Sequence, residues 1–218
     1  NMAKGPAMSR EEAIKAIEVG IDTVAELKEK GYNVFATGEM GIGNTTTSSA
    51  VCSVLLDQSV EKVTGKGAGL TNKDLEHKIE VIKQSIALNQ VDANDPIDVL
   101  SKVGGLDIAG MVGCYIGGAA LQVPVFIDGF ISSVAALIAI RLIPECAPYL
   151  FPSHCSNEPA GHLILDAIGK EPYILANMCL GEGTGAVMGF TIADYAFKAY
   201  WELPSFEQTN FGTYEELN

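Results

Sequence analysis

The amino-acid sequence predicts an α/β fold with a mostly parallel sheet flanked by helices. Short apolar segments with strand character alternate with segments of helical periodicity. Glycine-rich or acidic loops follow the strand segments, which is where open parallel sheets bind ligands. Of the 218 residues, 48% are hydrophobic and 19% are charged, which suffices for a sizeable core and argues against disorder.

The first helix is expected from Ser9 onward. Ser9 and Glu12 form a capping-box pattern. Apolar residues then recur at helical spacing: Ile14, Ile17, Ile21 and Val24. The buried strand expected at residues 34–37 leads into a glycine-rich loop, 38–44, and then a helix over 45–56.

The middle and the C-terminal part continue this alternation. A second glycine-rich loop, 64–69, precedes a helix that Thr71 can cap, with Asp74 at the capping-box position. Proline at the permitted first position opens a short helix at Asp95-Pro96. The remaining expected elements are helix 107–121, strand 123–127, the helix after Asp128-Gly129, strand 149–151, helix 159–168 and a helix from loop 181–185 to about Trp201. The sequence leaves open whether the polar and aromatic tail packs on a partner or is loose.

Charge and cysteine content restrict the partners and the compartment. The net charge of -13 excludes nucleic acid and anionic membrane as bulk partners, and a phosphate ligand would need local backbone N–H groups. Five scattered cysteines without CxxC spacing predict a reduced, cytoplasmic protein. The most apolar stretch, 130–143, is interrupted by Ser132, Ser133 and Arg141 and is too short to span a bilayer.

The loop at 38–44 is the first candidate site. A glycine-rich turn before a helix can direct several N–H groups at a phosphate, and a tight structural turn is an equally good interpretation. The loop is not a Walker A motif, and Thr46 stands where a dinucleotide fingerprint needs its third glycine. Glu39 would repel a phosphate, so it either faces another part of a substrate or is solvated.

Two further loops carry charged residues. Lys66 and Lys78 accompany the loop at 65–69 and could supply positive charge for a phosphate, although a surface role is commoner for a lysine. Three glycines surround Glu182 in the loop 181–185, which exposes its carboxylate and lets a substrate approach closely. Such a glutamate can act as a general base, or it is simply an acid favoured at a helix N-terminus.

Two other clusters do not match a known site. His154, Cys155, Glu158 and His162 lie close together but lack zinc-ligand spacing, so no metal is expected. Ser132-Ser133 lacks the Gly-x-Ser-x-Gly elbow of a nucleophilic serine.

Taken together, five segments resemble the nicotinate-nucleotide:dimethylbenzimidazole phosphoribosyltransferase family in order and spacing. They are 38–46, 65–70, 125–129, 156–162 and 180–186, and the resemblance covers nearly the whole chain. It implies a Rossmann-like homodimer that transfers phosphoribose from nicotinate mononucleotide to 5,6-dimethylbenzimidazole in assembly of the cobalamin nucleotide loop. It also implies that the catalytic domain is 1–218, and that a segment of the family preceding Asn1, which contributes to the base pocket, is missing.

The resemblance also implies site residues. Glu182 corresponds to the general base, and Glu39 is a second catalytic residue. The implied substrate-binding residues are Met40, Gly41, Gly67, Lys78, Asp128, Gly129, Leu180 and Gly181. No cofactor is expected, because the leaving nicotinate departs as a neutral ring nitrogen and one carboxylate can take the acceptor's proton.

Two alternatives remain at this point. The first is a catalytically silent paralogue that acts as a partner subunit, against which the retention of Glu39 and Glu182 counts. The second is a Rossmann-type dinucleotide binder, against which the failed fingerprint counts. The sequence does not decide among benzimidazoles, purines and phenols as the acceptor.

Overall fold

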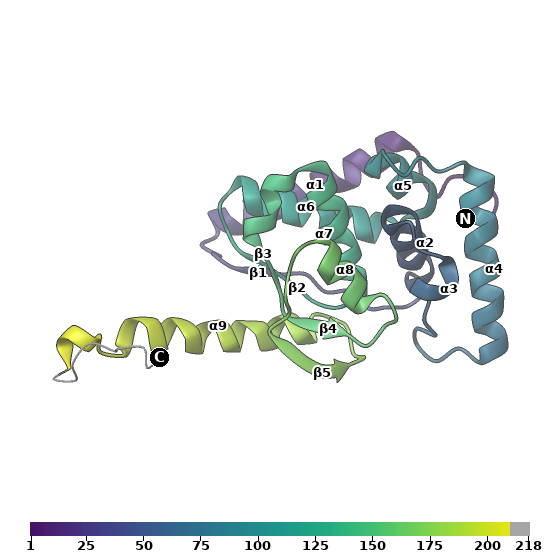
Figure 1. Ribbon diagram of the computed structural model, residues 1–218. Coiled ribbons are helices and arrows are strands. Elements are labelled where there is room, and N and C mark those ends of the chain that lie inside the picture. Colours follow the sequence, from purple (N-terminus) through teal and green to yellow (C-terminus); the bar gives the residue numbers. More distant parts are fainter. Residues whose placement is uncertain (210–218) are drawn as a thin grey trace.

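The computed structural model describes residues 1–209, and its strands form two small parallel sheets (Figure 1). The first sheet has the order β1 (Phe35–Ala36), β2 (Val125–Ile127), β3 (Leu150–Pro152), with all neighbours parallel. The second pairs β4 (His154–Ser156) with β5 (Ile174–Met178), also parallel. The predicted α/β class with parallel strands is therefore confirmed.

The helices begin close to the predicted caps. Ser9 and Glu12 form a capping box, as do Thr71 and Asp74, and the Asp95 side chain accepts from two N–H groups of the next helix. The helices are α1 (Arg10–Glu29), α2 (Thr45–Leu56), α3 (Val60–Val63), α4 (Asn72–Asn89), α5 (Pro96–Val103), α6 (Leu106–Ala120), α7 (Phe130–Leu142), α8 (Gly161–Ala167), α9 (Thr184–Glu202) and the short 3-10 turns η1 (Pro144–Tyr149) and η2 (Phe206–Gln208).

Some elements differ from the expectation. β5 was not predicted, because its central residues are exposed and give no apolar alternation. β4, α3 and η1 were also missed, and they are only three to six residues long. The strand expected at 123–127 is shorter, at Val125–Ile127. Residues 210–218 of the tail lie outside the described part of the chain, so the question about the tail stays open there.

The central strand β2 shows how the layers pack. Helices α1, α6 and α7 lie on one side of the three-stranded sheet, and α9 starts on the other side (Figure 1). Because side chains alternate along a strand, Val125 meets α6 while Phe126 meets the Phe190 ring of α9 at a centroid distance of 4.9 Å. Helix α7 is buried from Phe130 to Ala139 and forms the centre of the core.

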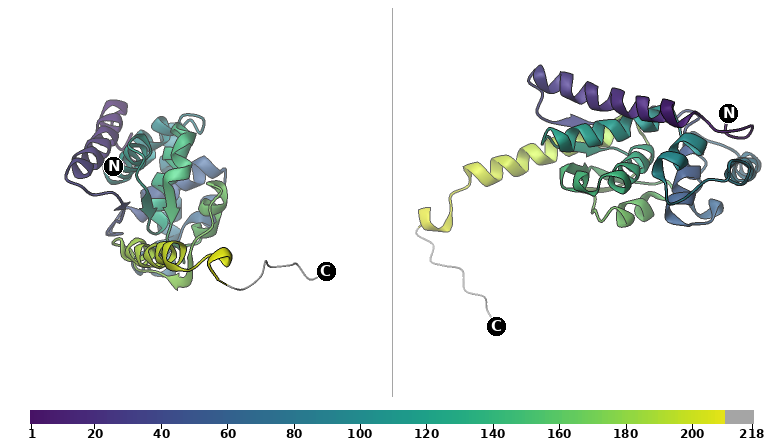
Figure 2. Two further views of the ribbon diagram at one scale, coloured as in Figure 1. Left: turned by 90° about the vertical axis from the view of Figure 1, so that its left-hand side faces the viewer. Right: turned by 90° about the horizontal axis from the view of Figure 1, so that it is seen from above.

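Helix α9 leaves this body. Figure 1 and the right view of Figure 2 show it running outward, and every described residue from Asp194 onward except Thr209 is exposed. Within residues 1–209, no helix combines the length and the apolar character that crossing a membrane requires.

Helices α1 and α6 approach closely through glycines. A Cβ at Gly113 would overlap the carbonyl oxygen of Ile17, and a Cβ at Gly20 would overlap that of Gly110. By contrast, a Cβ at Gly110 would meet open space.

We therefore expect Gly113→Ala to lower the free energy of unfolding by about 1–3 kcal/mol, the usual cost of overpacking. The matched variant Gly110→Ala on the same helix should be neutral or stabilising by up to about 1 kcal/mol, because alanine favours the helix. Urea denaturation of both variants checks this, and equal stabilities would contradict the close helix contact.

Candidate active site

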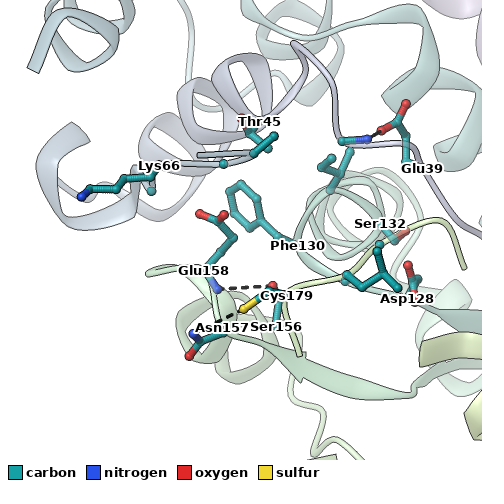
Figure 3. Close-up of a pocket in the computed structure, with 18 of the residues that line it drawn as sticks. Glu39, Thr45, Lys66, Asp128, Phe130, Ser132, Ser156, Asn157, Glu158 and Cys179 are labelled. Carbon is teal, nitrogen blue, oxygen red and sulfur yellow. Dashed lines mark hydrogen bonds between the residues drawn. The ribbon is translucent and has the colours of Figure 1, made fainter. Parts of the chain in front are cut away.

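Loops from distant parts of the chain enclose a cleft of about 520 Å³ at the carboxyl ends of the strands (Figure 3). The lining residues lie within 39–45, 64–68, 128–132, 154–159 and 179–182, with Leu75 added from α4. The cleft brings together all but one of the residues predicted for the site: Glu39, Met40, Gly41, Gly67, Asp128, Gly129, Leu180, Gly181 and Glu182. The exception is Lys78.

The first and last glycine loops are joined through their backbones. The Glu182 N–H donates to the Glu39 carbonyl oxygen at 2.8 Å. A Cβ at Gly38 would overlap the backbone nitrogen of Gly183, so only glycine permits this approach. The two predicted catalytic glutamates are consequently neighbours, although 142 other residues separate them in the sequence.

The two glutamates differ in their local settings. The Glu39 carboxylate accepts a hydrogen bond from the Gly41 N–H and is half-buried. Glu182 is exposed, has a φ of 63°, and lies between two glycines. Within residues 1–209 the Glu182 carboxylate makes no hydrogen bond, so it is available to a ligand. A left-handed φ is uncommon for a residue other than glycine and is often found where function constrains the backbone.

A second hollow of about 500 Å³ adjoins the cleft. It is lined by residues 36–40, Glu182, Gly183 and Val187. It shares Glu39, Met40 and Glu182 with the larger cleft. The residues Glu39, Met40 and Glu182 therefore form the border between the two hollows.

Asp128 follows the central strand β2 and is 2% exposed. Its Oδ2 accepts from the Gly183 N–H at 3.0 Å. Its Oδ1 accepts from the N–H groups of Gly185 and Ala186 at 2.9 and 3.1 Å. The carboxylate thus caps α9, whose own N-cap residue is Gly183 and offers no side chain.

Lys78 lies behind the cleft rather than in its lining. Its ammonium donates to Thr45 Oγ1 at 2.9 Å and to the Gly65 carbonyl oxygen at 3.0 Å. Burial lowers the pKa of Lys78, while the nearby Glu158 carboxylate partly opposes this. In this structure Lys78 holds the loop at 64–68 against α2.

Glu158 adds a further carboxylate to the cleft. A Cβ on Gly65 would overlap Glu158 Oε2, so only glycine leaves room for this side chain. Figure 3 places Glu158 and Lys66 on one side of the cleft and Glu39 on the other. The sequence placed Glu158 in a segment that carries the family resemblance and in a rejected metal cluster, but assigned it no role in the site.

His154 also lines the cleft, although the sequence assigned it no role. It is buried, and its Nδ1 lies 3.0 Å from Ser153 Oγ. Burial lowers its pKa, which favours the neutral ring. Among residues 1–209 no three His, Cys, Asp or Glu side chains are grouped as a metal site would require.

Sequence reasoning did not assign Thr45, Phe130 or Ser156 to the site, yet all three line the cleft. Ser156 belongs to a segment that carries the family resemblance, so a signal was present. Phe130 is 4% exposed and begins a buried helix. An aromatic residue in such a segment is expected to belong to the hydrophobic core, so the sequence offered no reason to assign it to the site.

Comparison with known proteins assigns the family. A family model described as Phosphoribosyltransferase matches residues 1–211. The chain belongs to this phosphoribosyltransferase family. Similar proteins include the nicotinate-nucleotide–dimethylbenzimidazole phosphoribosyltransferases of Ruminiclostridium cellulolyticum and Acetivibrio thermocellus, each 54% identical, over 217 and 215 residues. The matches cover 100% and 99% of this chain but 62% and 61% of those proteins, so the chain spans less than two thirds of their length.

A solved structure shares the fold. The crystal structure of CobT from Thermus thermophilus matches with a TM-score of 0.90 and 32% identity, covering 95% of this chain and 62% of that chain. The Rossmann-like α/β fold is therefore confirmed. None of the named relatives favours the alternative of a silent partner subunit.

The close approach at Gly38 gives a prediction. Gly38→Ala should force the loops at 38–44 and 181–185 apart, because the backbone of Gly183 cannot yield as a flexible side chain can. We expect faster hydrogen exchange of the Glu182 amide, since it loses its acceptor on Glu39.

The matched control is Gly129→Ala, also in the cleft, where a Cβ meets only the His154 ring at 3.6 Å, an ordinary contact. Exchange measured by NMR should change little in this variant. Equal exchange rates at Glu182 in the wild type and Gly38→Ala would contradict the tight junction.

Proposed function

We propose that the protein containing this chain transfers phosphoribose from nicotinate mononucleotide to 5,6-dimethylbenzimidazole or a related base. The products are α-ribazole 5′-phosphate and nicotinate, for assembly of the cobalamin nucleotide loop. The observation that carries the proposal is the junction of Glu39 and Glu182 at a cleft built from glycine loops. The names of the similar proteins support the same reaction.

The cleft suits both substrates. Gly41, Gly67 and Gly129 line the cleft, and backbone N–H groups of such glycine loops can bind phosphate without a basic surface. The Gly41 N–H would have to exchange its bond to the Glu39 carboxylate for the phosphate. Met40 and Leu180 are 66% and 62% exposed and line the cleft beside the two glutamates, which gives an apolar base a surface to contact. In a displacement the leaving base and the incoming base lie on opposite sides of one carbon atom. The cleft and the second hollow border each other at Glu39, Met40 and Glu182, so each hollow can take one of the two bases.

The proposed chemistry is a single displacement at C1′ of the ribose. One ring nitrogen of the acceptor forms the new bond to C1′. The bond from C1′ to the pyridinium nitrogen breaks, and its electron pair leaves with nicotinate as a neutral ring nitrogen. Glu182 takes the proton from the acceptor's other nitrogen, and Glu39 assists beside it. The displacement inverts the β-nucleotide to the α-product, and it requires no cofactor.

The proposal concerns the whole protein, since the relatives are longer than this chain. We propose that the additional part of the protein completes the pocket for the base. The five cysteines are free thiols, which supports a reducing, cytoplasmic compartment.

Glu182→Gln tests the role of the base, because the amide keeps the size of the side chain but cannot accept the proton. In the full-length protein we expect turnover to fall by about a hundred- to ten-thousand-fold. Binding of nicotinate mononucleotide, measured by calorimetry, should be nearly unchanged. Steady-state formation of α-ribazole phosphate gives the rate.

Glu145→Gln serves as the control, because Glu145 lies in the first turn of η1 and outside the cleft. It should keep wild-type turnover. If Glu182 is only a favourable acid at a helix terminus, its replacement costs roughly 0.3–1 kcal/mol of stability and little rate. Turnover within a few-fold of wild type would reject Glu182 as the base and make Glu39 the next candidate.

We also propose that the protein is a homodimer, and the surface of α9 supports this. Its exposed large apolar side chains are Val187, Met188, Ile192, Tyr195, Phe197, Tyr200 and Trp201, the last two 76% and 77% exposed. Large apolar side chains that stay exposed together on one helix often mark an interface. Aromatic residues such as these often dominate the binding energy.

Replacing Tyr200 and Trp201 by serine should weaken the dimer at least about thirty-fold, since interface aromatics commonly contribute about 2 kcal/mol or more. Val19→Ser, an exposed apolar position on α1, should leave the dimer intact. Sedimentation velocity over a concentration series measures both. A monomeric wild type, or a serine variant that dimerises like wild type, would reject α9 as the dimer interface.

A further inference from the structure

We infer that Asp128 is a positioning residue, which sets the rate of the proposed reaction through Glu182 instead of contacting the substrate. The inference rests on the proposed function. It replaces the substrate contact that the family resemblance implies for Asp128. The argument depends on which groups occupy the carboxylate and on what they hold in place.

The Asp128 carboxylate is already occupied by the protein. Both oxygens accept backbone N–H groups, three in all, from Gly183, Gly185 and Ala186. A carboxylate has about four acceptor positions, so little capacity is left for a substrate hydroxyl. The side chain is 2% exposed although its residue lines the cleft. Hydrogen bonds from N–H groups to a buried carboxylate are strong, and the start of a helix also favours negative charge.

These bonds fix the residues that follow Glu182. Gly183 is the N-cap of α9, and Gly185 and Ala186 belong to its first turn. No side chain of α9's own N-terminus makes a capping bond. Asp128 therefore ties the start of α9 to the end of the central strand β2, across 55 to 58 positions of sequence.

Glu182 is held from both sides as a result. Its own N–H is bound to the Glu39 carbonyl oxygen, and the next residue is bound to Asp128 Oδ2. Glu182 keeps a left-handed φ of 63° only while these neighbours stay fixed. Release of the Gly183 N–H would let the peptide relax and move the Glu182 carboxylate away from the acceptor.

His154 and Gly185 also hold the start of α9 in place. The His154 Nδ1 lies 4.0 Å from Asp128 Oδ1, and a Cβ on Gly185 would overlap the His154 ring. The helix start is thereby packed between the carboxylate and the ring, with no room for a larger residue at Gly185.

Asp128→Asn is the decisive variant. The amide has nearly the same size, but an NH2 group would replace the oxygen that accepts from Gly183 or from Gly185 and Ala186. We expect the rate constant kcat to fall about a hundred-fold, the usual cost of a small misplacement of a catalytic group. The dissociation constant of nicotinate mononucleotide, from calorimetry, should stay within a few-fold of wild type.

A double variant separates positioning from general damage. If Asp128 acts through Glu182, Asp128→Asn should cause no further loss of rate in a Glu182→Gln protein. Asp95→Asn is the matched control, because Asp95 also caps a helix with its carboxylate but lies outside the cleft. It should lower stability and leave kcat unchanged.

Hydrogen exchange gives a readout that does not depend on activity. Amides of Gly183, Gly185 and Ala186 should be protected in the wild type and exchange faster in Asp128→Asn. Asp128→Ser, which keeps one acceptor in a smaller side chain, should show the same pattern if Asp128→Asn fails to fold.

The outcomes distinguish this inference from the proposed function. Weaker nucleotide binding with unchanged kcat, additive losses in the double variant, or unprotected wild-type amides would each overturn the positioning role. A wild-type protein that forms no α-ribazole phosphate would overturn the proposed function. In that case the positioning role fails for this reaction, while the exchange data still decide whether Asp128 holds the loop.

Discussion

The hydrogen bonds from the start of α9 to the buried Asp128 carboxylate connect the two halves of the candidate site. Asp128 follows the central strand, and the N–H groups that donate to its carboxylate lie at the start of the last long helix. The loop that carries Glu182 is therefore fixed relative to the sheet. The loop that carries Glu39 is fixed against it in turn, because Gly38 and Gly183 meet backbone to backbone. These two contacts bring the backbones of both glutamate loops together at the end of the sheet.

The electrostatics of the cleft follow from the same arrangement. Four residues with carboxylate side chains, Glu39, Asp128, Glu158 and Glu182, line a cleft in a chain of net charge -13. The buried lysine behind it donates its hydrogen bonds to Thr45 and the Gly65 carbonyl. Lys66 also lines the cleft. An anionic ligand can therefore bind to Lys66 and to oriented backbone N–H groups, which act at short range and require glycine to let a ligand approach. This explains why glycine-rich loops surround an acidic site.

Local sequence was sufficient where the interacting groups are close in the chain. The Ser9–Glu12 and Thr71–Asp74 boxes were predicted correctly, because each involves residues three positions apart. The glycine loops before α2 and α9 were located for the same reason. Strand β5 was missed because its pairing with β4 depends on packing, and its exposed residues carry no pattern. The sequence placed Lys78 at the nucleotide, and only the structure revealed its contacts behind the loop.

By itself, the sequence determined the α/β class, the approximate helix starts, and the glycine loops that carry Glu39 and Glu182. These are set by short-range periodicity, capping and backbone freedom, and they can be read from a few neighbouring residues. The tertiary structure alone decided that the two loops touch, that Asp128 caps a helix 55 residues away, and that α9 presents an apolar surface. The reason is physical: a contact between distant segments depends on how the layers pack. The residues next to a side chain in the sequence do not show which distant residue it will contact.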